Sequence, residues 1–224
     1  MTITLWAIAL GLLVGARHAF EPDHLAAVGT LVADARGPAR AAWLGAIWGL
    51  GHTAALGLVA GVLALLGATL PAAVERVLEL GVALMLLVLG VRGIIRAVHD
   101  HQRGTPFAHA HGGAAHAHGG ADAHVHVAGQ TLALRPFVIG VVHGLAGSGA
   151  LTALAAAAFT DVRARLAYVL LFGVGSVLGM AAVSGLAGWP LARLTRAPQM
   201  HRAFSVIVAL SAIGTGIVWG WSVV

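Results

Sequence analysis

The sequence predicts an all-α integral membrane protein, with six transmembrane helices arranged as a 3+3 inverted repeat. Of its 224 residues, 59% are hydrophobic and only 9% are charged, and the mean hydropathy is +0.90. Apolar blocks long enough to span a bilayer recur along the whole chain. The two halves of the chain also resemble each other in sequence, and positive charge divides unevenly between the loops. These observations together indicate a membrane protein built from a duplicated unit.

Six apolar runs, separated by proline, glycine and charged residues, are the predicted spans. They cover residues 3–28, 42–66, 75–96, 136–159, 166–189 and 202–222. Backbone groups in lipid need internal hydrogen-bond partners, and these runs are too long for barrel strands, so each span is expected to be a helix. The predicted domains are a first three-helix repeat over 1–96, a histidine-rich loop over 97–135, and a second three-helix repeat over 136–224.

Similar segments in the two halves carry the predicted repeat. Three pairs resemble each other: 15–28 and 140–153, 48–57 and 172–181, and, more weakly, 75–90 and 201–216. This pairing aligns His18 with His143 and His52 with Ser176. A unit with an odd number of spans enters the membrane in the opposite direction the second time, which is typical of transporters that bind their substrate near the interface of the halves.

Arginines predict the orientation in the membrane. The chain has no lysine and no cysteine, so its net charge of +5 comes from arginine, and disulfides and thiolate metal sites are excluded. Arginines flanking apolar spans reflect topology, so no nucleic-acid partner is expected. Nine loop arginines fall on one side: Arg36, Arg40, Arg92, Arg96, Arg103, Arg135, Arg193, Arg196 and Arg202. Three fall on the other: Arg76, Arg163 and Arg165. The richer side is predicted to be cytoplasmic, with both termini outside, in a multi-pass protein of the cell (inner) membrane.

The first span contains an unusual polar stretch, RHAFEPDH, at residues 17–24. Pro22 lacks an N–H, so the carbonyl of His18 loses its usual helical partner and the helix is expected to be kinked or broken there. Broken helices at membrane depth are tolerated where they line a cavity, and in transporters they expose carbonyls to cations. The stretch therefore predicts a cation site formed by His18, Asp23, His24 and a freed carbonyl. Glu21 is either a further ligand or a residue that supports one.

Two more histidines lie inside predicted spans, His52 in the second and His143 in the fourth. At about 1.5 Å per residue, His18 and His52 lie near one depth and His143 slightly shallower. Each could be an isolated buried histidine, but four near one depth beside an aspartate favour a metal site. The candidate ligands are His18, Glu21, Asp23, His24, His52 and His143. Imidazole with some carboxylate suits Ni²⁺, Co²⁺, Zn²⁺ or Cu²⁺, whereas Ca²⁺ and Mg²⁺ prefer oxygen ligands.

The motifs resemble those of the nickel/cobalt transporter (NiCoT) family, in particular its short six-span, urease-associated and efflux-type nickel permeases. The stretch His18-x4-Asp23-His24 resembles the family signature H-x4-D-H, and Gly51-His52-Thr53 resembles its second-span motif G-H-[S/T]. The resemblance implies that His18, Asp23, His24 and His52 recognise the metal. Classical members have eight spans and an acidic motif in the later half, where this chain has HGLAGSGALTAL, so the shorter relatives are the better match.

Between the third and fourth predicted spans runs a long polar segment rich in histidine, glycine and alanine. Such a composition predicts disorder in the absence of metal, and weak multivalent chelation on the cytoplasmic side. An alternative is a linker without function. The auxiliary metal-binding residues are four H-x-H pairs: His99 and His101, His109 and His111, His116 and His118, and His124 and His126.

The predicted function is membrane transport of a divalent transition metal, Ni²⁺ or Co²⁺, through the intramembrane His/Asp site. The metal is then the substrate, and no prosthetic group is expected. A cytoplasmic histidine loop suits both uptake and efflux, so the direction stays open. The expected partners are the metal ion, the lipid bilayer and cytoplasmic nickel-delivery proteins.

Two alternatives come from other classes. One is a membrane metal sensor or buffer that binds metal without moving it. The other is an intramembrane hydrolase with Ser148 of Ala146-Gly147-Ser148-Gly149 as nucleophile. The hydrolase is disfavoured because His201 lies at the mouth of the last span, too shallow to act as the base, and because no H-E-x-x-H motif is present. The protein is therefore not expected to be an enzyme.

Overall fold

A computed structural model describes residues 2–33, 35, 37–102, 108–111, 114–117, 124–127, 130–194 and 198–224. Within these ranges, side chains are described for 9–33, 35, 37–99, 134–147, 155, 158–190 and 199–224. The side chains of the predicted loop histidines other than His99, and that of Ser148, therefore lie outside the part that is described. Their roles stay predictions.

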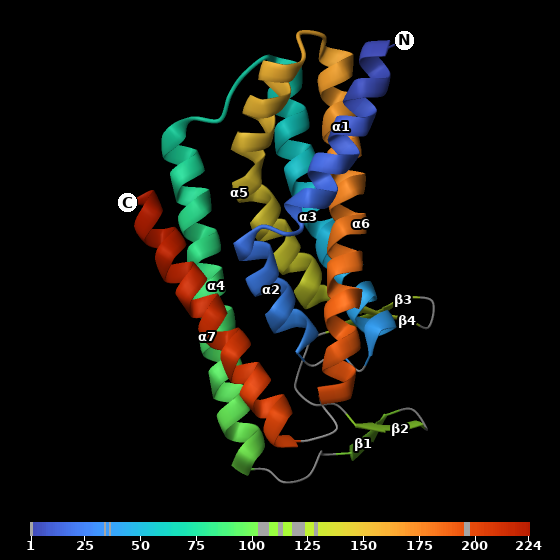
Figure 1. Cartoon of the computed structure of the whole chain (residues 1–224), viewed down its shortest axis with the longest axis vertical. Coiled ribbons are helices and arrows are strands. Elements are labelled where there is room, and N and C mark those ends of the chain that lie inside the picture. The colour runs from blue at the N-terminus through green and yellow to red at the C-terminus, as the bar shows by residue number, and fades with distance from the viewer. Residues whose placement is uncertain are drawn as a thin grey trace.

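The described residues form seven α-helices (Figure 1). These are α1 (Thr2–His18), α2 (Pro22–Val32), α3 (Pro38–Leu66), α4 (Ala72–Gln102), α5 (Leu134–Ala158), α6 (Val162–Leu194) and α7 (Pro198–Val223). Four short strands lie in the connection between α4 and α5. Strand β1 (Ala108–His111) pairs antiparallel with β2 (Ala114–Ala117), and β3 (His124–Val127) pairs antiparallel with β4 (Gln130–Ala133).

Helices α3, α4, α6 and α7 each contain a segment long and apolar enough to cross a membrane. Large hydrophobic side chains face outward along the bundle; Leu13 is 70% exposed, Leu186 72% and Trp221 86%. Soluble proteins rarely expose so much contiguous apolar surface, so these faces require lipid. The chain is therefore a helical membrane protein, as the sequence predicted.

The first predicted span, 3–28, consists of two helices. Helix α1 ends at His18 and α2 begins at Pro22, and Figure 1 shows the two helices following each other along the length of the bundle. The prediction of a disrupted helix at Pro22 is confirmed, in the form of a complete break. Each of the remaining helices from α3 to α7 runs along the bundle without such a break.

The helices form two packed groups. Helix α3 packs against both α5 and α6, and α1 packs against α6, whereas α4 and α7 pack mainly against each other. Figure 1 shows the α4/α7 pair to one side, with α2 between the pair and the other helices. Contacts of α2 with α3, α4, α6 and α7 connect the two groups. The break in the first pass therefore lies at the junction of the two groups.

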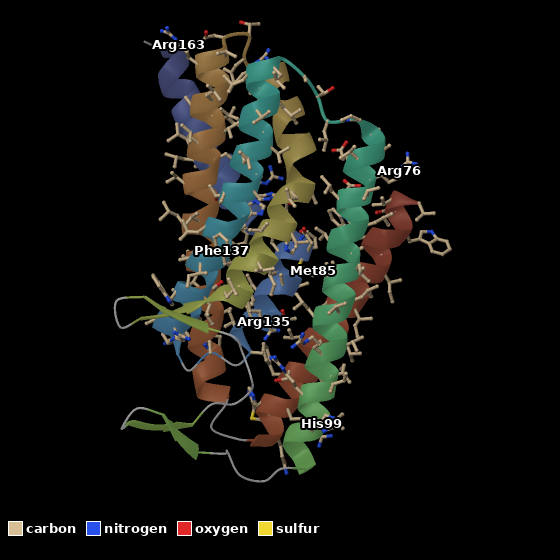
Figure 2. All side chains as sticks on the ribbon, turned by 180° about the vertical axis from the view of Figure 1, so that it is seen from behind. Arg76, Met85, His99, Arg135, Phe137 and Arg163 are labelled. Carbon is tan, nitrogen blue, oxygen red and sulfur yellow. The ribbon has the colours of Figure 1, made fainter. Side chains whose placement is uncertain are left out.

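Arginines occupy both ends of the bundle. Figure 2 shows Arg163 at one end and Arg76 toward the same end, while Arg135 and His99 lie toward the other. Arg76 and Arg163 thus lie toward one end and Arg135 toward the other, while the sidedness of the loops stays a prediction. Which end faces the cytoplasm stays a prediction.

Candidate metal site

Local backbone chemistry explains the break between α1 and α2. A residue that precedes proline is pushed out of the helical conformation, and Glu21 accordingly has an extended backbone with φ −64° and ψ 146°. Pro22 then occupies the start of α2, where its missing N–H costs nothing. Asp23 follows in the first turn, where the positive end of the helix dipole favours a carboxylate.

The backbone carbonyl of His18 is not freed, and this corrects the sequence prediction. It accepts a hydrogen bond from the N–H of Glu21 at 3.1 Å, and the carbonyl of Arg17 accepts one from Phe20 at 2.9 Å. Tight bonds of this kind commonly satisfy the last carbonyls of a helix. The potential metal ligands at the break are therefore side chains.

Four imidazoles from four helices meet beside the break. His18 ends α1, His24 lies in the first turn of α2, and His52 and His143 lie inside α3 and α5. The ring centroid of His24 lies 4.3 Å from that of His18, 5.2 Å from that of His52 and 4.8 Å from that of His143. His24 is therefore the centre of this histidine cluster.

Asp23 joins two of these rings. Its Oδ1 lies 2.9 Å from Nδ1 of His24, and its Oδ2 lies 3.4 Å from Nε2 of His143. Asp23, His24, His52 and His143 are each at most 5% exposed. Burying a carboxylate in an apolar bundle is costly unless it is paired, and the two imidazoles provide that pairing.

Several ring nitrogens face the cluster without a hydrogen bond. Among the described residues, Nε2 of His18, Nε2 of His24 and both ring nitrogens of His52 are buried and unpartnered. Buried polar atoms normally have partners, so such a group calls for an explanation. His18, His24 and His52 can each offer one ligand atom such that these atoms lie within 4.8 Å of one another, and so can Asp23, His24 and His143. Two overlapping three-ligand sets thus share His24.

Glu21 supports the cluster from its edge. Its Oε1 lies 2.8 Å from Nδ1 of His18, while its side chain is 48% exposed. Histidines that bind metal usually donate their other N–H to a carboxylate, which fixes the ring and makes the ligating nitrogen more basic. The Glu21–His18 and Asp23–His24 pairs both have this arrangement.

Close packing of α3 on α5 positions His52 beside His143. A Cβ atom at Gly144 would collide with the backbone carbonyl of His52, and one at Gly140 would collide with that of Trp48. Small residues let transmembrane helices approach this closely. The glycines of α5 therefore bring the two buried histidines within reach of His24.

A cavity of about 290 Å³ adjoins the cluster and reaches the α4/α7 pair. Glu79 of α4 and Trp219 of α7 line it together with Glu21, His24 and other cluster residues. Glu79 was not among the predicted ligands, although a carboxylate inside the predicted span 75–96 was itself a signal. Only the packing of α4 beside α2 reveals that Glu79 shares a cavity with the cluster.

The structure thus brings together five of the six predicted ligands: His18, Asp23, His24, His52 and His143. The sixth, Glu21, contacts His18 at the rim. His99 lies elsewhere, exposed near the end of α4 (Figure 2). That these side chains bind metal stays a prediction.

The fold and the cluster define a class: helical membrane proteins with a buried histidine and aspartate cluster at a broken helix. The chain belongs to the family of the urease accessory protein UreH. It is 30% identical over 210 residues to UreH of Bacillus sp. (strain TB-90), a match that covers 94% of this chain and 88% of that relative.

A second relative is the chloroplast protein FOR GROWTH AND FERTILITY 1 of Arabidopsis thaliana, 28% identical over 212 residues. That match covers 92% of this chain and 56% of the relative, so the chain spans little more than half of the plant protein. No protein-family model matches the chain, and no solved structure matches it.

Proposed function

We propose that the protein transports a divalent transition metal, Ni²⁺ or Co²⁺, across the membrane through the histidine cluster. The observation that carries the proposal is the set of unpartnered imidazole nitrogens of His18, His24 and His52, buried side by side at a broken helix. Isolated structural histidines would be hydrogen-bonded to neighbouring helices. Two independent facts add support: the motifs resemble those of nickel/cobalt transporters, and the related UreH is named as a urease accessory protein.

The donor set favours a transition metal. Three imidazoles with carboxylates behind them suit Ni²⁺, Co²⁺, Zn²⁺ or Cu²⁺, whereas Mg²⁺ and Ca²⁺ would need an oxygen shell. In this proposal, Nε2 of His18, Nε2 of His24 and one nitrogen of His52 bind the ion. Glu21 and Asp23 orient the first two rings, and the shared position of His24 lets the ion pass toward Asp23 and His143.

We further propose that the six passes form a 3+3 inverted repeat, as the sequence predicted. Close contacts between helices support the repeat. When both residues of such a contact are replaced by the residues aligned with them in the other half, the resulting pair is also in close contact. Gly15 approaches the carbonyl of Phe172, and its counterpart Gly140 approaches the carbonyl of Trp48, the counterpart of Phe172.

The remaining segments behave in the same way. Gly175 approaches the carbonyl of Leu12, and the aligned Gly51 approaches that of Phe137. In the third pair of segments, Gly90 approaches the carbonyl of Ala209, and the aligned Gly216 approaches that of Ala83. A chance similarity of glycine-rich spans would not reproduce reciprocal contacts in all three pairs, so these contacts favour a duplicated unit.

The cavity beside the cluster is the proposed access route. It lies where the α4/α7 pair faces the other helices, and Glu21 and Glu79 give it negative charge that attracts a cation. Movement of the two helix groups against each other would open the cluster to alternate sides of the membrane, as in other transporters built from inverted repeats. In this scheme the protein is a non-catalytic carrier, with its histidine-rich loop collecting metal in the cytoplasm.

Metal flux in proteoliposomes tests the proposal. Purified wild type, His18→Ala and a control, His99→Ala, would be reconstituted and supplied with ⁶³Ni²⁺, with Co²⁺ and Zn²⁺ as competitors. Loss of a residue that hydrogen-bonds a metal ligand typically lowers metal affinity or activity by about 10- to 100-fold. Loss of the ligand His18 itself is therefore expected to reduce flux by about a hundredfold or more. His99→Ala should match the wild type.

Two outcomes would overturn the proposal. Flux that is equal in wild type and His18→Ala would exclude the cluster as the transport site. Binding without flux in every variant would identify a sensor or buffer instead.

A further inference from the structure

Two aromatic rings pack against the histidine cluster, Phe172 on α6 and Trp48 on α3. The ring centroid of Phe172 lies 5.2 Å from that of His18. The ring centroid of Trp48 lies 5.4 Å from that of His24 and 5.7 Å from that of His143. Trp48 and Phe172 are aligned positions of the two halves. His18 and His143 are aligned as well, so their contacts with these aromatic rings are counterparts of each other.

The two aromatic rings lie on opposite sides of the cluster along the length of the bundle. Figure 1 shows α3 and α6 running in opposite directions, and Figure 2 shows Arg163, the second residue of α6, at one end. Trp48 precedes His52 in α3 by about one helical turn. Phe172 precedes Ser176, which aligns with His52, by the same number of residues in α6. Phe172 therefore lies toward the Arg163 end of the bundle, and Trp48 toward the opposite end.

The cavity of about 290 Å³ lies on the Phe172 side of the cluster. Phe172 lines it together with Val14 of α1 and Ala146 of α5. Figure 1 shows α1 starting and α5 ending at the end of the bundle where α6 starts. Residues before the histidine of α1 and after that of α5 therefore lie toward this end. Trp48 does not line the cavity, and its side chain is 0% exposed, so it covers the cluster on the other side.

The indole ring of Trp48 is held in place by packing. Among the described residues, its Nε1 is buried and has no hydrogen-bond partner. A buried donor without a partner is costly. The ring can turn away from the cluster without breaking a hydrogen bond, and water that enters in its place can accept one from the N–H. The unpartnered N–H therefore suits a ring that moves.

We propose that Trp48 is the gate that closes the histidine cluster on the side away from the cavity, and that Phe172 closes the other side when Trp48 opens. The inference rests on the proposed transport function, because a carrier exposes its site to one side of the membrane at a time. Tryptophan has the largest apolar ring, which lets it cover His24 and His143 together. In the predicted orientation, the cavity side faces outward and Trp48 lies toward the cytoplasm.

Thiol labelling tests the gate, because the chain has no cysteine and a single introduced one reports access. Ala146→Cys places a thiol in the wall of the cavity. Its rate of reaction with a membrane-impermeant methanethiosulfonate would be measured on right-side-out and inside-out membrane vesicles without added metal. The reporter would be combined with Trp48→Ala and with a matched control, Trp43→Ala, which removes an exposed tryptophan of the same helix.

With Trp48 intact, the thiol should react mainly from one face of the membrane, the cavity side. In Trp48→Ala, the rate from the other face should rise by at least about tenfold, which corresponds to about 1.4 kcal/mol in the barrier. Trp43→Ala should leave that rate unchanged. Equal rates from the two faces with Trp48 intact, or equal rates from the closed face in Trp48→Ala and Trp43→Ala, overturn the proposal.

Should Trp48→Ala fail to fold, Trp48→Leu gives a milder test, since leucine fills more of the space that the indole leaves. It should raise the rate from the closed face by a smaller factor, and an unchanged rate overturns the proposal. Because the labelling needs no metal, failure of the gate and failure of transport are distinguishable. Flux without a gated thiol removes only the gate, and a gated thiol without flux removes only transport.

Discussion

The first pass through the bundle, made by α1 and α2, and helix α5 both place a histidine at aligned positions, but they differ in the backbone that follows. His18 on α1 aligns with His143 on α5, and both rings reach the same cluster. Beyond this point α1 stops and α2 restarts at Pro22, whereas α5 continues to Ala158 with Gly147 at the position that aligns with Pro22. The difference lies in one helix break and in the Asp23–His24 pair that follows it.

Two segments of similar sequence therefore contribute differently to the cluster. In the first pass, the break turns the backbone so that His18, Asp23 and His24 gather at one point, although they are five and six residues apart on the chain. The unbroken α5 contributes a single imidazole.

Restoring a continuous first helix should have the largest effect. In Pro22→Ala, the helix regains a backbone N–H and loses a ring that disfavours continuity by about 3 kcal/mol, so His18 and His24 would separate. We expect the affinity for Ni²⁺, measured by equilibrium dialysis with ⁶³Ni²⁺, to weaken by at least about tenfold.

Pro38→Ala is the matched control, because Pro38 also starts a helix but lies far from the cluster along the chain. Wild-type affinity in Pro22→Ala would show that the break is not needed to assemble the ligands.

Separating α5 from α3 should have the next largest effect. In Gly144→Ala, the new methyl group would meet the backbone carbonyl of His52, so the two helices must move apart. Overpacking of this kind costs about 1–3 kcal/mol, which should lower the midpoint of thermal unfolding and the affinity for Ni²⁺ together.

Gly61→Ala serves as its control, since the space around Gly61 on α3 is open. That change should leave the midpoint unchanged or raise it, because alanine favours a helix over glycine by about 1 kcal/mol. Equal midpoints in the two variants would contradict the close approach of α3 and α5.

Neutralising the access cavity should reduce the rate of transport more than the affinity. Glu79→Gln removes a negative charge that lines the cavity but leaves the cluster intact, so flux at low Ni²⁺ should fall about threefold while equilibrium binding stays the same. Glu75→Gln is the control, one helical turn away and not among the residues that line the cavity. A large loss of equilibrium affinity in Glu79→Gln would instead make Glu79 a ligand.

Removing the loop histidines should have the smallest effect. Replacing the histidines of the four H-x-H pairs between His99 and His126 with serine leaves α1, α2 and α5 unchanged. Flux at saturating Ni²⁺ should therefore stay within about twofold of wild type. The number of weakly bound Ni²⁺ ions per chain, measured by dialysis, should fall. Loss of flux together with an unaltered cluster affinity would place an essential step in the loop.

Much of the architecture could be predicted from local sequence features. Apolar runs of membrane-spanning length predicted helices that the structure contains, and Pro22 predicted the break, because the constraint that proline places on Glu21 is local. The buried histidines and Asp23 were recognisable for a related reason: polar side chains are expensive inside apolar spans and therefore stand out.

Other features of the site were not predicted, either because a turn closes on the end of a helix or because the partners are distant in the chain. The carbonyl of His18 was expected to be free, but the turn after α1 directs the N–H of Glu21 onto it. No local pattern indicated that Nε2 of His143 faces Asp23, or that Glu79 shares a cavity with the cluster.

The kind of protein, the break in its first pass and the presence of histidine and aspartate inside the spans thus follow from the sequence alone. Tertiary structure decided which of these side chains meet. Spacing along one helix specifies a face, but the convergence of rings from four helices depends on how closely and at what rotation those helices pack. That packing is set by reciprocal glycine contacts such as Gly144 on His52 and Gly15 on Phe172, whose partners lie in the other half of the chain.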